Sequence, residues 1–169
     1  MPMYVKETGK GVELKSALAF LKSSRVLIGI PQAASSRRGE ITNAELAFIH
    51  THGSPINRIP ARPFLEPAIE EAKEQIAGRM EAAAKAAIDG NADTAINELH
   101  KAGMYGENAA KDYFTAGHFA PNAGITVEGG WMRNRVSGKP VYVKGKHSTT
   151  PLIDTGSLRS SITHVIERK

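Results

Sequence analysis

The side chains with the chemistry for catalysis in this chain are those of histidine, aspartate, glutamate, lysine and serine, because its 169 residues include no cysteine. The missing thiols exclude disulfide bonds, thiolate zinc sites, iron–sulfur clusters and cysteine nucleophiles. His50 and His52 form an H-x-H spacing, which on a strand would aim both imidazoles at one metal ion and at a helix end would separate them. No complete ligand set such as H-E-x-x-H accompanies them, so we predict no metal site.

The residue types of a hydrolase triad occur late in the sequence as Asp154, Ser157 and His164. Triads are defined by geometry, and the G-x-S-x-G turn that presents a nucleophilic serine is absent. Asp154, Thr155, Gly156 and Ser157 are better explained as a tight turn, in which side-chain oxygens bind the backbone and the glycine takes a positive φ. Phosphate-binding glycine motifs are also missing. We therefore predict no catalytic residues and no cofactor.

Positive charge is concentrated in one stretch of the chain. The formal net charge is +5, and five basic residues with no acidic one lie between Trp131 and Thr150. They are Arg133, Arg135, Lys139, Lys144 and Lys146. With Trp131 and Tyr142, they are suited to contact phosphate groups, since clustered cations release counterions from nucleic acid. The surrounding glycines and prolines suit a solvated, extended loop, and we favour that interpretation over a nucleic-acid site.

The overall composition is typical of a globular chain, with 41% apolar and 23% charged residues. We predict one domain over residues 1–169, with flexible loops or assembly arms at 32–42 and 124–150. The longest apolar run, residues 26–30, is too short to cross a bilayer, and residues 1–15 lack the apolar centre of a signal peptide. We expect a soluble, intracellular protein.

Apolar spacing predicts two long helices in the middle of the chain. From Leu65 the apolar residues recur at alternating steps of three and four, which predicts one helix that ends at Gly90. A second helix is predicted over 93–114, capped by Asp93, with an interruption at the glycines 103 and 106.

Shorter elements are predicted on either side of these helices. They are a helix over 12–22, a buried strand over 25–30, a helix over 44–51 and a strand over 158–166. Thr42 or Asn43 would cap the helix over 44–51, and Gly53 would end it. The proline-rich segment 59–65 is stiff, because each proline restricts its own backbone and that of the residue before it.

Two segments, taken in this order, resemble a known family. The first runs from N-A-E-L-A at 43–47 through H-G at 52–53 into I-P-A-R-P-F-L at 59–65, and the second is P-L-I-D-T-G-S-L at 151–158. They resemble the tailed-bacteriophage neck and tail-completion family, which includes the lambdoid tail-component proteins and, more distantly, the Mu-like virion morphogenesis proteins. The similarity covers roughly residues 26–166. The chain departs from the family at 50–53, where relatives often have an acidic residue before the glycine.

The resemblance implies an α+β fold, in which a small, mostly antiparallel sheet packs against one long helix and a second, interrupted helix, with extended loops. It implies a non-enzymatic virion protein that forms a ring, hexameric by the family's pattern, at the head–tail junction or the tail end. The implied partners are further copies of the chain, adjacent connector, tail-terminator or tail proteins and, transiently, packaged DNA, without a membrane. The implied locations are the virion and, during assembly, the host cytoplasm.

The residues to which we assign structural or assembly roles are Arg62, Pro63, Phe64, Asp154, Thr155 and Gly156. The Arg62 guanidinium is suited to bind backbone or a carboxylate, and the turn at 154–156 would direct the last strand. A tail terminator or minor tail protein is the close alternative. A nucleic-acid-binding module using the basic stretch at 131–147 is the alternative of another class, and a metal-dependent hydrolase built on His50 and His52 is a third.

Overall fold

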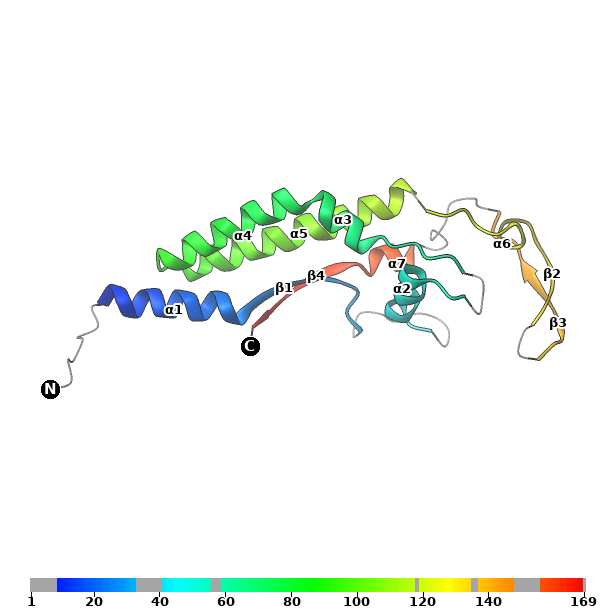
Figure 1. Ribbon diagram of the computed structural model, residues 1–169, viewed down its shortest axis with the longest axis horizontal. Coiled ribbons are helices and arrows are strands. Elements are labelled where there is room, and N and C mark those ends of the chain that lie inside the picture. Colours follow the sequence, from blue (N-terminus) through cyan, green and yellow to red (C-terminus); the bar gives the residue numbers. More distant parts are fainter. Residues whose placement is uncertain are drawn as a thin grey trace. The chain divides into compact units, whose positions relative to one another are not determined.

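The computed structural model describes residues 9–32, 41–55, 59–117, 119–134, 137–147 and 156–168. The chain divides into two compact units. The first comprises Met1–Gly29, Glu66–Ala110 and Ile162–Lys169, and the second comprises Ile30–Leu65 and Lys111–Ser161. Helices occur together with two small antiparallel sheets, which confirms the predicted α+β class (Figure 1). The single-domain interpretation stays a prediction.

The sheet of the first unit pairs β1 (Ser24–Gly29) with β4 (Thr163–Arg168). The strands are antiparallel, and Leu27 lies opposite Val165. These two side chains are 49% and 45% exposed, whereas their neighbours Val26, Ile28, His164 and Ile166 are half-buried. The strand predicted at 25–30 is confirmed, but it is not a buried strand, because only one face of this two-stranded sheet is covered.

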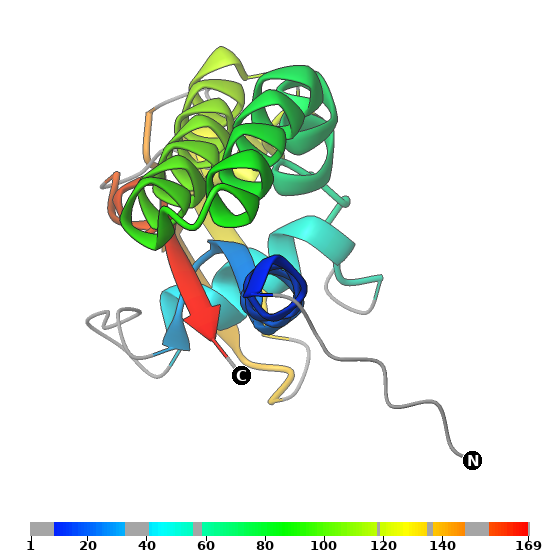
Figure 2. The same cartoon turned by 90° about the vertical axis from the view of Figure 1, so that its left-hand side faces the viewer.

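The covered face of this sheet packs against a helical hairpin. The hairpin consists of α4 (Lys73–Ile88) and α5 (Ala92–Ala116), which lie side by side (Figure 2). On its sheet-facing side, α5 brings Gly103 against His164 and Gly106 against Ile28. The predicted helix near the start of the chain is confirmed as α1 (Gly9–Ser23). It packs on α4 through a small cluster that consists of Ala17, Ala86, Ala87 and Ala95, flanked by Phe20 and Leu21.

The predicted interruption was assigned to the wrong helix. The helix expected from Leu65 to Gly90 is divided into α3 (Leu65–Glu71) and α4, with Ala72 between them. By contrast, α5 runs without a break through both of its central glycines. A Cβ at Gly106 would lie only 2.9 Å from Ile69 Cδ1. The glycines therefore allow close packing, which outweighs their low helix propensity.

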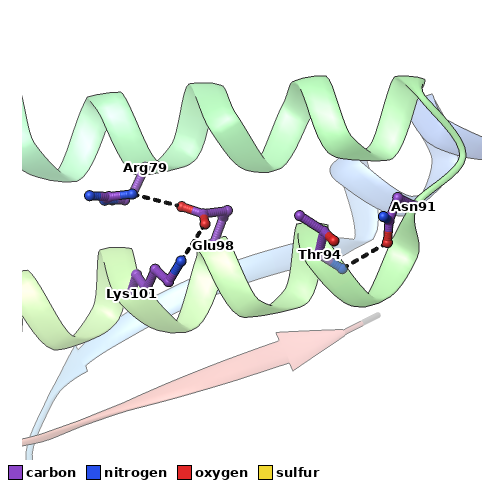
Figure 3. A network of polar contacts seen from close by, with 5 residues as sticks. All are labelled: Arg79, Asn91, Thr94, Glu98 and Lys101. Atoms are coloured by element: carbon purple, nitrogen blue, oxygen red, sulfur yellow. Dashed lines mark hydrogen bonds and ion pairs between the residues drawn. The ribbon is translucent and has the colours of Figure 1, made fainter.

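The start of α5 also differs from the prediction. Asp93 was expected to cap the helix, but the Asn91 Oδ1 atom accepts a hydrogen bond from the Thr94 backbone N–H at 3.1 Å (Figure 3). Asparagine suits this role as well as aspartate does, because both side chains offer an oxygen to the unpaired backbone donors of the first turn.

In the second unit, the helix predicted over 44–51 is confirmed as α2 (Asn43–His52), which is one residue longer at each end. Of the two candidate caps, Thr42 is the one used. Its backbone N–H donates to Glu45 Oε2 at 2.8 Å, and its hydroxyl accepts from the Glu45 backbone N–H at 3.2 Å. These bonds form a capping box, and the backbone bond from Thr42 is the main cause that lowers the pKa of the Glu45 carboxyl. Gly53, with φ of 72°, ends the helix.

The region predicted as a loop or arm at 124–150 contains regular structure. A short helix, α6 (Gly124–Glu128), leads into the antiparallel strands β2 (Gly129–Arg133) and β3 (Pro140–Lys144). The extended-loop interpretation is therefore wrong for these residues. The other predicted arm, at 32–42, falls largely on residues 33–40, which lie outside the described residues.

The strand predicted over 158–166 is only partly correct. One helical turn, α7 (Ser157–Ser160), comes first, and β4 begins at Thr163. Gly156, at the start of α7, has φ of 73° and is in the left-handed region, as the turn prediction required of this glycine. Among the described residues, no helix combines the length and the apolar composition needed to cross a bilayer.

Candidate functional site

The two segments that carry the family resemblance meet at Asn43. The asparagine is 1% exposed, and its Nδ2 atom donates to Ser157 Oγ at 3.1 Å and to Ser161 Oγ at 2.6 Å. The Ser161 hydroxyl donates in turn to the Ser157 carbonyl at 2.7 Å. Asn43 Oδ1 is buried without a hydrogen-bond partner among the described residues. One amide thus fixes the start of α2 to α7, and we refer to Asn43, Ser157 and Ser161 as the motif junction.

Arg62 binds backbone, one of the two partners predicted for it. Its Nε donates to the Ala120 carbonyl at 2.8 Å and its Nη2 to the Pro121 carbonyl at 2.9 Å. The residue is 6% exposed, and burial lowers the pKa of its guanidinium. An arginine remains charged even so. The two carbonyls therefore replace some of the water that would otherwise solvate this cation. Binding two carbonyls at once suits the planar, forked guanidinium of arginine.

The residues beside Arg62 anchor the same segment. The backbone N–H of Arg62 donates to the His50 carbonyl at 2.6 Å, and this bond joins the segment to α2. Phe64 is 3% exposed and packs edge-on against Phe114 at 5.3 Å between ring centroids. Pro63, between them, is exposed. The alternation of buried and exposed side chains at 62–64 is that of an extended chain with one covered face, which the prolines favour.

The second predicted structural cluster is only partly described. Asp154 and Thr155 lie outside the described residues, as do the other residues of 151–155. Gly156 lies next to α7, the element that the motif junction holds.

The predicted basic contacts lie on the β2–β3 hairpin and beside it. Arg133, Lys139 and Lys144 are exposed, and Lys146 is half-buried. Arg135 lies outside the described residues. Trp131 and Tyr142 are directly paired across the strands, with ring centroids 5.4 Å apart. The structure thus joins the two aromatic residues that sequence reasoning had associated with the basic ones.

His50 and His52 do not come together as metal ligands. His52 Nδ1 lies 3.0 Å from the Phe48 carbonyl, and its ring is tilted on that of Phe48 at 4.2 Å. His50 Nδ1 is buried. Both lie near the end of α2, where a two-residue spacing separates side chains around the helix. In the described part of the chain, no three histidine, aspartate or glutamate side chains are grouped as ligands for a metal.

His164 has polar partners that sequence reasoning missed. Its Nδ1 lies 2.7 Å from Glu107 Oε2, and its Nε2 lies 3.4 Å from His100 Nδ1. His100 and Glu107 are seven residues apart, and that spacing puts both on one side of α5. The spacing was visible in the sequence, but their pairing with β4 was not. The three residues with the side-chain types of a triad do not form a described site, because Ser157 belongs to the motif junction and Asp154 lies outside the described residues.

Comparison with known proteins adds no family to these observations. No protein-family model, curated protein or solved structure matches the chain.

Proposed function

We propose that this chain is a structural protein of a tailed-phage virion, a neck or tail-completion subunit that forms a ring at the head–tail junction. Its partners are further copies of itself, six in a closed ring, and the connector, terminator or tail proteins on either side. Its role is non-enzymatic. The protein acts in the virion, and before assembly it is in the host cytoplasm.

The observation that carries the proposal is the motif junction. The resemblance depends on two segments more than 85 residues apart, 43–65 and 151–158. Asn43, in the first, donates to Ser157, in the second, and to Ser161 just beyond it. Two segments that resemble one family by chance would have no reason to share a buried polar contact. Their association supports the interpretation that they are parts of one structural unit rather than two unrelated matches.

A second observation supports the assembly of several copies. Among the described residues, nine of the buried apolar residues are alanine and five are larger, namely Phe64, Leu99, Phe114, Leu158 and Ile162. In the same described part of the chain, fourteen large apolar side chains are exposed, including Phe48 at 64% and Trp131 at 71%. A chain that buries small residues and exposes large ones leaves apolar surface for other chains to cover.

The proposal is tested in a phage whose genome encodes this chain. Mass spectrometry of purified particles is expected to detect the chain as a virion component. Particles made without it are expected to be heads and tails that do not join, as seen by negative-stain electron microscopy. The wild-type chain supplied from a plasmid restores infectious particles. Purified virions that lack the chain, or complete tailed particles assembled in its absence, would contradict the proposal.

A further inference from the structure

The β2–β3 hairpin has one face with a definite chemical pattern. Alternate residues of a strand share a face, and in this antiparallel pair Trp131 lies opposite Tyr142, while Arg133 lies opposite Pro140. Lys144, two residues beyond Tyr142 on β3, shares that face at the other end. The face therefore has an aromatic pair at its centre and a cation on each side, about 7 Å along the strands from the rings. We refer to Arg133, Trp131, Tyr142 and Lys144 as the aromatic face.

The rings of the aromatic face are available for contact. Trp131 is 71% exposed and Tyr142 is 56% exposed. Their planes are inclined at 68°, so the two rings contact each other edge to face. This contact does not cover the π-surfaces of both rings. Exposed aromatic area of this kind is costly to leave in water, and a planar, apolar group that stacks on it is the natural occupant.

The described charged side chains of the hairpin, residues 129–144, have one sign. The described cations of the hairpin are Arg133, Lys139 and Lys144, and all three are exposed. No acidic residue occurs between Trp131 and Thr150. Within the described residues, no carboxylate lies within ion-pair distance of these three cations. An occupant of the aromatic face therefore carries negative charge on either side of a planar ring.

We propose that the aromatic face binds single-stranded nucleic acid, with one base stacked on Trp131 or Tyr142 and the adjacent phosphates on Arg133 and Lys144. Bases alternate with phosphates along a single strand, as rings alternate with cations across this face, and stacking tolerates any base sequence. A duplex fits less well, because its bases are stacked on one another and present no free ring. This inference rests on the hairpin alone and holds whether or not the chain is a virion protein.

The test uses the tryptophan of the face itself, since Trp131 is the single tryptophan of the chain. The full-length protein is titrated at low salt with an oligo(dT) strand of about 15 nucleotides. A base that stacks on the indole is expected to quench its fluorescence. With two phosphate contacts, at Arg133 and Lys144, the logarithm of the binding constant should fall with the logarithm of the salt concentration with a slope of about −1.4. A duplex of the same length should bind more weakly.

A matched pair of variants separates stacking from the fold of the hairpin. Tyr142→Ala should lower the affinity about tenfold, and Trp131→Ala, followed by the anisotropy of a labelled strand, should lower it as much. Met132→Ala with Val141→Ala changes the opposite face, whose side chains are 41% and 43% exposed, and should leave the affinity within about twofold.

Several results would overturn the proposal. They are an absence of quenching at low salt, an equal loss of affinity in the control variant, and a duplex bound as tightly as the single strand. Quenching by phosphatidylserine vesicles or by polyglutamate but not by oligo(dT) would assign the face to a membrane surface or to an acidic protein instead.

Discussion

At the scale of single residues, Arg62 is the side chain whose chemistry is most constrained. It is a buried cation whose guanidinium donates hydrogen bonds to the backbone carbonyls of Ala120 and Pro121. Removing the guanidinium would remove both hydrogen bonds, and the loss of hydrogen bonds to a charged group is more costly than the loss of neutral ones.

We predict that Arg62→Ala lowers the free energy of unfolding by about 3 kcal/mol, measured by urea denaturation. Arg62→Lys should lose about half as much, because an ammonium group is a point donor and does not reach both carbonyls in the geometry of the fork. Arg25→Ala is the control, since Arg25 is exposed on β1, and it should change the stability by less than about 0.5 kcal/mol. Equal stability of the Arg62→Lys variant and the wild type would show that the forked geometry is unimportant.

The sequence predicted the identity of this residue and its type of partner but not the partner itself. A lone arginine between two prolines indicates a fixed guanidinium, because the backbone around it is stiff. Ala120 and Pro121 lie almost 60 residues further on and carry no side-chain signal. Contacts with backbone carbonyls leave no pattern in residue types, so only the fold reveals them.

At the scale of elements, α5 shows packing overriding local preference. Glycine disfavours helix by about 1 kcal/mol relative to alanine, which is why an interruption was predicted at Gly103 and Gly106. Both instead lie where the sheet of the first unit approaches the helix. The break falls at Ala72, although alanine is the strongest helix former, so the break is not a matter of local propensity.

We predict opposite signs for two glycine-to-alanine substitutions in the helical hairpin. At Gly103 an added Cβ meets the ring of His164, so Gly103→Ala should destabilise the protein by about 1–3 kcal/mol. At Gly78, on α4, a Cβ meets nothing within 4 Å, so Gly78→Ala should stabilise it by up to about 1 kcal/mol. Thermal and urea unfolding measure both, and stabilisation by Gly103→Ala would refute the packing of α5 on β4.

The helical hairpin is also joined by a three-residue ion cluster. Glu98 on α5, 12% exposed in its side chain, accepts from Lys101 at 2.6 Å and from Arg79 on α4 at 3.2 Å (Figure 3). The bond with Lys101 is the main cause that lowers the pKa of the Glu98 carboxyl below its ordinary value of 4.5, and Arg79 adds to it.

This cluster predicts an acid dependence of stability. A carboxyl whose pKa is lower in the folded chain stabilises the fold above its unfolded pKa, and the contribution is lost as the pH falls through the folded value. Wild-type stability should therefore fall relative to that of Glu98→Gln as the pH drops below about 4.5, measured by urea unfolding across a pH series. Glu70→Gln is the control, because it removes the carboxylate of an exposed ion pair with Lys73. Parallel pH profiles of the wild type and Glu98→Gln would contradict the role of the cluster.

The sequence analysis did not predict the β2–β3 hairpin, because glycines and prolines are typical of loops. The signal that would have found it is the run Val141, Tyr142 and Val143, since β-branched and aromatic residues favour strands. The turn also has a local signature, because Asn134 Oδ1 accepts from the Ser137 backbone N–H at 2.9 Å and Gly138 has φ of 67°. By contrast, the sequence narrowed the cap of α2 to Thr42 or Asn43, because caps depend on residues close in sequence.

At the scale of the whole molecule, the distribution of apolar residues agrees with the proposed assembly. Leu27 and Val165 lie opposite each other on the open face of the β1–β4 sheet, and Phe48 is exposed on α2. Large apolar side chains at such positions suit contacts between copies of a chain better than a monomer in water.

The central claim is that copies of this chain close into a ring, and the most direct test is the mass of the purified protein by native mass spectrometry across a concentration series. We predict one discrete assembly of six copies that persists on dilution, without a ladder of larger species, because a closed ring leaves no free interface. A strict monomer at every concentration would contradict self-assembly, and a continuous series of larger masses would contradict closure.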